Sequence, residues 1–390
     1  MKYNRILILI VIAQFLATSV WFAGNAIYSS LQVDLGLSFD LAPKLTVAVQ
    51  WGFIIGTLVY AIAMIPDRYS PAKVFFSSTI LAAISNLLIL LPLGFEGIYI
   101  TRFLVGFFLA GIYPVGMKIV TDWFLTGAGK SLGFLVGALV LGTSLPHFIK
   151  SQSIGFSWEI VIITTSLLAV LSGFIVYRFV GDGPFRKKAN AFSLQGFFSI
   201  FKNKMINRAL FGYFGHMWEL YAFWAFTPII LAIFNEVNQT SINVPLWTFI
   251  IIGVGAIGCV IGGSLSKQYG SCRIAFFAMV FSASCALLSI LFFGFNEVVF
   301  LGIMLIWGFF VVMDSPQFSS VIADYSEKEY VGSTLTIVNS IGFGITIVSI
   351  QLVAFLVENN QNFFWVLAIG PILGLYPTSK VAFRANFPEL

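Results

Sequence analysis

The sequence predicts an all-α polytopic membrane protein with twelve transmembrane helices in two pseudo-symmetric six-helix bundles. Of the 390 residues, 59% are hydrophobic and only 9% are charged, whereas an ordinary soluble domain carries roughly a quarter charged residues. Long apolar runs alternate with short charged clusters, and the ~10-residue alternating segments of a membrane β-barrel do not occur. This composition excludes a soluble enzyme, a nucleic-acid-binding protein and a disordered scaffold.

Twelve segments are long and apolar enough to cross the bilayer, which takes about 20 residues of helix. The N-terminal MKYNR and its apolar run look at first like a signal peptide. Because the run is over-long and ends in no clean cleavage site, we expect a retained first helix. The expected spans are residues 5–27, 44–65, 73–93, 97–119, 131–150, 157–179, 207–234, 245–266, 272–294, 297–320, 331–357 and 361–382.

The basic residues predict the orientation of these spans. With a cytoplasmic N-terminus, 18 of the 21 Lys and Arg residues fall on the cytoplasmic side. Only Lys44 and Lys150 lie in outer loops, and Arg102 lies within a span. This bias follows the positive-inside rule, so we expect a multi-pass protein of the plasma (inner) membrane with both termini in the cytoplasm.

Two sequence patterns recur in the two halves of the chain at nearly one spacing. PDRYSPAK at 66–73 resembles SKQYGSCR at 266–273, and a second pattern relates Gly106, Pro114 and Asp122 to Gly308, Pro316 and Asp324. Matches at a common offset indicate a duplicated six-helix unit with parallel halves. The expected domains are an N-terminal bundle at 1–180, a cytoplasmic linker at 181–206 and a C-terminal bundle at 207–390.

The loop after the second span carries residues typical of one family. Asp67, Arg68 and Lys73 resemble the core of the G-x-x-x-D-R-x-G-R-[RK] signature of the major facilitator superfamily of secondary transporters, although Ala63 and Ser70 stand where its glycines would. The resemblance covers essentially the whole chain and implies alternating access around a cavity lined by helices one, four, seven and ten. It also implies a cytoplasmic gate made of Asp67, Arg68, Lys73, Lys267 and Arg273; the alternative is that these are exposed topology charges.

Ionisable side chains within the spans are costly, so each one indicates a function. His216 and Glu219 are three residues apart in the seventh span and share a helical face, ~15–18 Å from its cytoplasmic entry. Such a pair is a candidate proton carrier; the alternative is a structural His–Glu hydrogen bond. Asp314, just before Pro316, is a second candidate for proton coupling, with helix capping as its alternative.

The remaining polar and aromatic residues of the spans predict a substrate cavity. Amides there can both donate and accept hydrogen bonds, and large amphipathic rings suit a planar or cationic ligand. Arg102 can bind an anionic group or extend to the interface instead. The expected cavity residues are Trp21, Asn25, Gln50, Arg102, Tyr113, Trp218, Tyr221, Trp224, Gln317 and Asn339.

These features predict a secondary active transporter that moves a small organic or amphiphilic solute, coupled to protons and directed towards efflux. Proton-coupled uptake of a metabolite or metal chelate is the alternative, and a transporter-derived membrane sensor is the alternative from another class. We expect a monomer in the lipid bilayer whose partners are the solute and protons, with no enzymatic activity, cofactor, metal site or nucleic-acid partner. The sequence leaves open the substrate, the direction and whether sodium replaces the proton.

Overall fold

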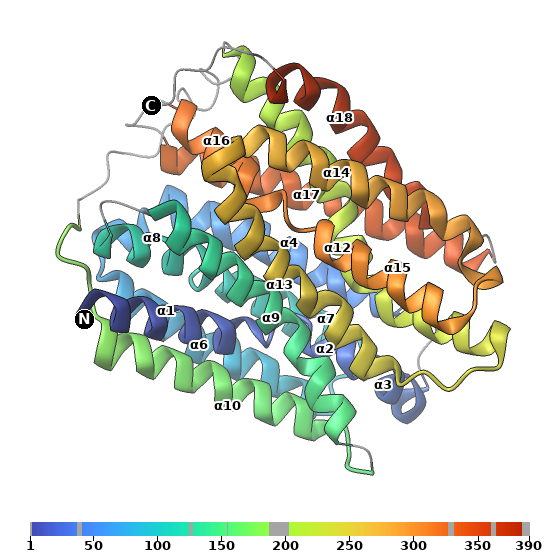
Figure 1. Cartoon of the computed structure of the whole chain (residues 1–390). Helices are drawn as coiled ribbons and strands as arrows, with labels where there is room; N and C mark the ends of the chain where they lie inside the picture. Colours follow the sequence, from blue (N-terminus) through green and yellow to red (C-terminus); the bar gives the residue numbers. More distant parts are fainter. Residues whose placement is uncertain are drawn as a thin grey trace.

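The computed structural model describes residues 2–36, 41–124, 128–153, 155–186, 203–326, 331–359 and 364–383. All regular elements in these ranges are helices (Figure 1). In chain order they are α1 (Lys2–Thr18), α2 (Ala23–Ala26), α3 (Tyr28–Leu35), α4 (Leu41–Ile62), α5 (Ile65–Arg68), α6 (Pro71–Leu87), η1 (Leu88–Leu90), α7 (Gly94–Leu109), α8 (Tyr113–Trp123), α9 (Ala128–Gln152), α10 (Glu159–Ile175), η2 (Val176–Val180), α12 (Lys204–Asn238), α13 (Val244–Tyr269), α14 (Ser271–Leu288), η3 (Ser289–Gly294), α15 (Glu297–Phe310), α16 (Ser315–Tyr325), α17 (Val331–Glu358), η4 (Phe364–Ala368) and α18 (Ile369–Ala382).

The helices confirm the predicted all-α membrane fold. Eleven helical stretches of the described chain are long and apolar enough to cross a membrane, from Pro43–Ile62 to Phe364–Ala382. The predicted first span corresponds to a shorter apolar helix, Asn4–Thr18, followed by α2 and α3. It falls below the usual spanning length because the helix is interrupted within the membrane.

Three spans predicted as continuous helices, 5–27, 97–119 and 297–320, are divided in the structure. Their breaks lie at residues 19–22, 110–112 and 311–314. Two of the breaks precede a proline, Pro114 or Pro316, which cannot donate a backbone hydrogen bond and crowds the carbonyl four residues earlier. The break in the first span contains no proline, so only its surroundings in the fold stabilise it.

The breaks free backbone carbonyls, and side chains from other helices bond to them. Cys259 of α13 donates to the carbonyl of Val312 at 3.6 Å, and Arg102 of α7 donates to the carbonyl of Val20 at 3.4 Å. Non-helical backbone is tolerated in a membrane only where such groups satisfy it. Hydrogen bonds from α13 and α7 therefore stabilise both broken stretches inside the bundle.

The two halves contain matching helix contacts, as the internal repeat in the sequence predicts. A Cβ on Gly106 of α7 would overlap the carbonyl oxygen of Val49 on α4, and a Cβ on Gly308 of α15 would overlap that of Ile251 on α13. Both members of the second contact lie 202 residues after those of the first. Small residues of this kind allow membrane helices to approach closely, so each half is locked by the same backbone contact.

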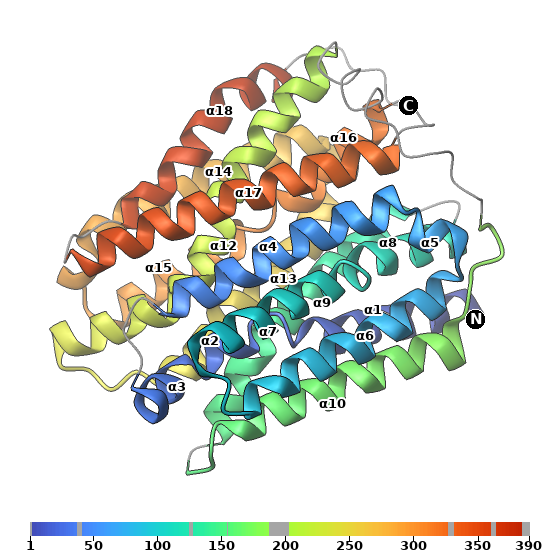
Figure 2. The same cartoon turned by 180° about the vertical axis from the view of Figure 1, so that it is seen from behind.

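The two halves meet along two pairs of helices. Figure 2 shows α4 and α17 side by side, and α9 and α13 pack together near the middle of Figure 1. Contacts within each half join α1 to α9 and α10, and α12 to α17 and α18. The predicted linker at 181–206 lies largely outside the described residues, so its boundaries stay a prediction.

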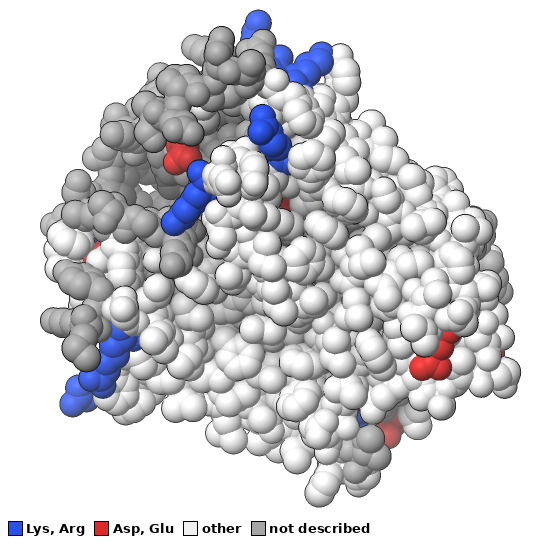
Figure 3. Space-filling model, viewed as in Figure 1, with Lys and Arg blue, Asp and Glu red and all other residues white. Residues whose placement is uncertain are grey.

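The two sides of the bundle differ in charge. The start of α1 and the end of α18 lie towards the same side, which we call the termini side; α3 lies on the opposite or far side (Figure 1). In Figure 3 most of the basic side chains in view lie towards the termini side, and acidic side chains appear at the right edge, on the far side. The charge asymmetry read from the sequence is thus present in the folded molecule.

The close contact at Gly308 makes a direct test of the packing. Gly308→Ala should destabilise the protein by about 1–3 kcal/mol because the new methyl group overlaps the backbone of α13. Gly302→Ala in the same helix meets no atom within 4 Å and should be neutral or stabilising by up to ~1 kcal/mol through helix propensity. Thermal unfolding of both variants in detergent measures the difference, and equal effects would contradict the assigned contact.

Candidate functional site

Six aromatic rings from the two halves meet at the centre of the bundle. Trp21 lies in the break of the first span, and its ring centre is 5.8 Å from Tyr221 of α12 and 6.0 Å from Phe343 of α17. Phe53 of α4 lies 4.5 Å from Phe343. We call this set the aromatic cluster; its members are Trp21, Phe22, Phe53, Tyr221, Trp224 and Phe343. All six are buried, so in this conformation rings fill the space between the halves at that depth.

Polar atoms beside the aromatic cluster have no hydrogen-bond partner among the described residues. Gln50 is fully buried, and both its amide nitrogen and its amide oxygen are unpaired. It lies three residues before Phe53 on the same face of α4. The indole nitrogens of Trp21 and Trp224 are also buried and unpaired. Leaving a buried polar group unpaired costs about 1–3 kcal/mol, so these atoms are available to a ligand.

Asn25, unlike these residues, already has a hydrogen-bond partner within the protein. Its side-chain nitrogen donates to the hydroxyl of Thr46 on α4 at 2.7 Å. Thr46 lies on the face of α4 that also carries Gln50 and Phe53. The bond therefore fixes the segment after the break of the first span against the second span.

The structure pairs His216 with Asp314. His216 Nδ1 lies 2.7 Å from Asp314 Oδ1, and both side chains are almost completely buried. The atoms are within ion-pair distance without the angles of a hydrogen bond, and His216 Nε2 has no hydrogen-bond partner among the described residues. The expected contact of His216 with Glu219 is thus replaced by one across helices. Asp314 reaches the histidine because it closes the break between α15 and α16.

Asn339, Gln317 and Tyr113 are further residues predicted to line the cavity, and Tyr213 connects the first of them to His216. The hydroxyl of Tyr213 donates to Asn339 Oδ1 on α17 at 2.9 Å, and the rings of Tyr213 and His216 lie 6.1 Å apart. Gln317 is buried on α16, and its side-chain nitrogen is unpaired within the described chain. Tyr113, the first residue of α8, packs against the main core after the break of the fourth span.

Glu219 lies in a separate polar site inside the second half. One carboxylate oxygen, Oε1, accepts from the hydroxyl of Ser282 on α14 at 2.7 Å and from the indole nitrogen of Trp307 on α15 at 2.6 Å. These two donors join Glu219 to the ninth and tenth spans. Its hydrogen bonds therefore suit a residue that positions helices, and its expected role in proton coupling stays a prediction.

Arg102 and Trp218 bond to polar groups outside the aromatic cluster. The guanidinium of Arg102 donates to Asn86 Oδ1 on α6 at 2.6 Å and is fully buried within the first half. Asn86 in turn donates to Ser166 of α10 at 2.9 Å. Trp218 donates to the carbonyl of Val366 at 3.0 Å and so faces the last span. The place of both residues in the substrate cavity stays a prediction.

The predicted gate charges contact their own halves. Asp67 forms an ion pair with Lys118 at 3.0 Å, and Arg186 donates to the backbone carbonyls of Asp67 and Tyr69. Arg273 donates to the carbonyl of Ala382 at 3.3 Å. The other gate residues, Arg68, Lys73 and Lys267, are exposed. Among the described residues no ion pair links these charges across the halves, so their role as a gate stays a prediction.

The functional residues missed by sequence reasoning are partners supplied by other helices. Phe22, Phe53 and Phe343 complete the aromatic cluster. Asn86, Ser282 and Trp307 bond to the buried charges. Each is apolar or weakly polar in an apolar run, where many similar residues occur. The described chain contains no group of three or more His, Cys, Asp or Glu residues placed to hold a metal ion, so the His216–Asp314 pair has no third ligand there.

A family model and a curated relative both match this chain. The sequence model of the Major Facilitator Superfamily matches residues 10–350. The probable L-galactonate transporter of Escherichia coli (strain K12) is 21% identical over 239 residues, which make up 53% of this chain and 50% of the relative. The matched region thus spans about half the length of this curated relative.

A double-mutant cycle tests the partner assigned to His216. His216→Ala and Asp314→Ala should lose stability non-additively, with a coupling of about 0.5–3 kcal/mol typical of contacting residues. His216→Ala and Glu219→Ala should show a smaller coupling, because Glu219 bonds elsewhere. Unfolding free energies of the single and double variants in mixed micelles give both couplings, and the reverse order would refute the assignment.

Proposed function

We infer that this chain, which belongs to the Major Facilitator Superfamily, is a secondary active transporter that couples movement of a small organic or amphiphilic solute to protons. The family and the matched relative support the transporter class. The proposed solute class and the proton coupling rest on the residues at the centre of the bundle, where the two halves meet. There, buried unpaired polar atoms adjoin aromatic rings, and a buried histidine contacts a carboxylate.

The chemistry of the centre supports a solute with both an apolar face and hydrogen-bonding groups. Rings stack on flat or cationic surfaces, and Gln50 can donate and accept hydrogen bonds. The guanidinium of Arg102 donates to the neutral amide oxygen of Asn86, a bond that holds the side chain within the first half without balancing its charge. A bound solute would supply the partners that Gln50, Trp21 and Trp224 lack within the described protein.

The His216–Asp314 pair is the proposed centre of proton coupling, with Glu219 as the second candidate. Asp314 stands at the break of the tenth span, so a rearrangement of α16 against α15 would change its distance from His216. Protonation of either member changes the charge of the pair, which biases the two arrangements differently. Transport would then follow from rocking of the halves about the aromatic cluster.

The charge asymmetry supports a cytoplasmic termini side in the inner membrane. Export is the direction that the sequence predicted, and the aromatic centre supports it through its fit to an amphiphilic solute. The name of the relative favours a second candidate, transport of a sugar acid or similar metabolite. Uptake of a metal chelate and a sensing role without solute accumulation are two further alternatives. The transport experiment below distinguishes them from the proposed function. We propose no catalytic step and no cofactor.

Substitution of Gln50 separates a binding role from a structural one. Gln50→Met keeps the approximate side-chain volume and removes two unpaired polar atoms, so the unfolding temperature should stay equal or rise. Solute binding should weaken by about 1 kcal/mol or more, because a hydrogen bond to the ligand is lost. The control Gln152→Met changes an exposed amide near the end of α9. Loss of stability without loss of transport would refute the binding role.

Proteoliposomes carrying a pH gradient test the coupling. The panel is L-galactonate, the amphiphilic cation tetraphenylphosphonium and a ferric hydroxamate chelate. We expect wild-type protein to accumulate one of these, and the polarity of the gradient that drives it distinguishes export from uptake. Asp314→Asn should lose accumulation while keeping solute exchange; Asp324→Asn, at the end of the same span, should behave as wild type. Uphill transport by Asp314→Asn would overturn the proposed centre.

A further inference from the structure

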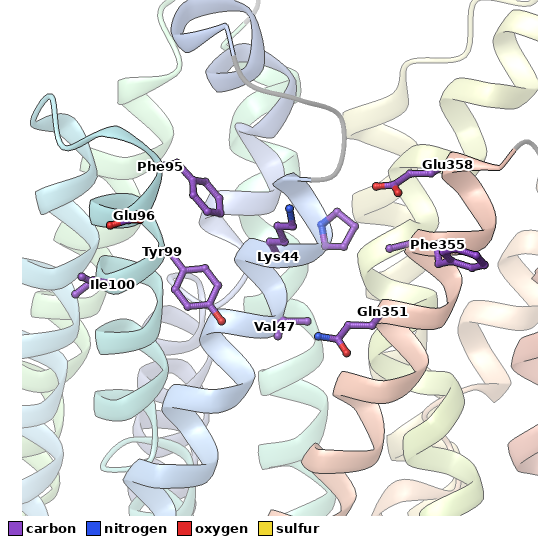
Figure 4. A pocket seen from close by; sticks show the side chains of 11 residues that line it. Lys44, Val47, Phe95, Glu96, Tyr99, Ile100, Gln351, Phe355 and Glu358 are labelled. Carbon is purple, nitrogen blue, oxygen red and sulfur yellow. The ribbon is translucent and has the colours of Figure 1, made fainter.

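A groove of about 690 Å³ lies on the far side, where the second, fourth and eleventh spans end (Figure 4). It is lined by α4 and α7 of the first half and by α17 of the second half. None of its residues belongs to the aromatic cluster or to the His216–Asp314 pair. The groove is therefore separate from the proposed transport site.

The charged residues of the groove lie at the ends of their helices. Glu96 is in the first turn of α7, Lys44 is in the first turn of α4 and Glu358 is the last residue of α17. Figure 4 shows the carboxylate of Glu358 pointing from α17 towards α4. The ends of spans lie at the level of the lipid headgroups. Two acids and one base give this rim a net charge of −1.

The deeper part of the groove is apolar with two polar groups. Tyr99 and Gln351 point towards one another across Val47 (Figure 4). The walls at Phe355 and Ile100 are 60% and 56% exposed, as expected for side chains that contact lipid tails. Apolar walls below a charged rim match the division of a phospholipid into acyl chains and headgroup.

We propose that this groove binds a phospholipid of the far-side leaflet whose headgroup carries a primary ammonium beside its phosphate, as in phosphatidylethanolamine. The ammonium donates hydrogen bonds to the carboxylate of Glu358, and the phosphate lies towards Lys44. Glu96 adds negative charge on the α7 side of the rim. Charge-assisted bonds of this kind are stronger than neutral ones. The negative rim disfavours an anionic headgroup, and the trimethylammonium of a choline headgroup has no hydrogen to donate.

The groove joins the two halves, so its occupant acts on their arrangement. A lipid held by α7 of the first half and α17 of the second stabilises the conformation in which these far-side ends lie as they do here. This consequence rests on the proposed alternating access, because a lipid shifts the equilibrium by its difference in affinity for the two states. The binding itself does not depend on the transport function.

Lipid binding to delipidated, detergent-solubilised protein tests the proposal by native mass spectrometry. The probes are phosphatidylethanolamine, phosphatidylcholine and phosphatidylglycerol with identical acyl chains. Wild-type protein should bind phosphatidylethanolamine about tenfold more tightly than the other two lipids, a difference equivalent to about 1.4 kcal/mol. The double variant Glu96→Gln/Glu358→Gln should lose this preference while retaining the wild-type unfolding temperature, because both acids lie at exposed helix ends.

Glu297→Gln is the matched control, since Glu297 is an exposed acid at the far-side start of α15, outside the groove. It should keep the wild-type lipid preference. Equal binding of the three lipids by wild-type protein, or an unchanged preference in the double variant, would overturn the proposal. Because binding is read without any solute, a failed transport experiment and a failed lipid site remain distinguishable.

Discussion

A polar group inside a membrane protein must find its partner within the protein or in a ligand, because lipid tails offer none. Two of the three broken spans, the first and the tenth, meet this constraint through other helices: Arg102 and Cys259 bond to carbonyls that the breaks release. Asn86 and Ser282 then bond to the buried charges of the two halves. Several buried side-chain amides have unpaired atoms among the described residues, those of Gln14, Gln50 and Gln317 among them. Gln50 differs by its place beside Phe53, where the halves meet, and a ligand there would supply the missing partners.

The contacts within each half and the contacts between the halves differ in rigidity. Within each half, glycines bring backbones into direct contact, as at Gly106 and Gly308, and such contacts leave little freedom. Between the halves, the central contacts are made by rings whose centres lie 4.5–6.1 Å apart, and rings can slide over one another at a small energetic cost. A molecule built in this way is suited to moving as two bodies about its centre. The His216–Asp314 contact lies beside one of the breaks, where a small rearrangement changes it.

The fold was largely predictable from the sequence, and the side-chain partners were not. Span lengths, the repeat and the charge bias are properties of composition and spacing, so the twelve-helix architecture followed from them. Pro114 and Pro316 marked two of the breaks, whereas nothing in the residues at 19–22 marked the third. His216 and Glu219 share a helical face, yet they have different partners, Asp314 for His216 and Ser282 with Trp307 for Glu219. The rotation of α12 against its neighbours, which selects these partners, is set by packing across the bundle. Trp218 faces the last span for the same reason.

The distance between the far-side ends of the halves tests the central claim most directly, since it requires no knowledge of the solute. Spin labels at Val33 and Val298, which are 81% and 80% exposed, would report this distance by electron–electron double resonance in nanodiscs. The account predicts two populations whose ratio changes with pH in the wild-type background and does not change with pH in Asp314→Asn. A single distance that is independent of pH in both proteins would contradict it.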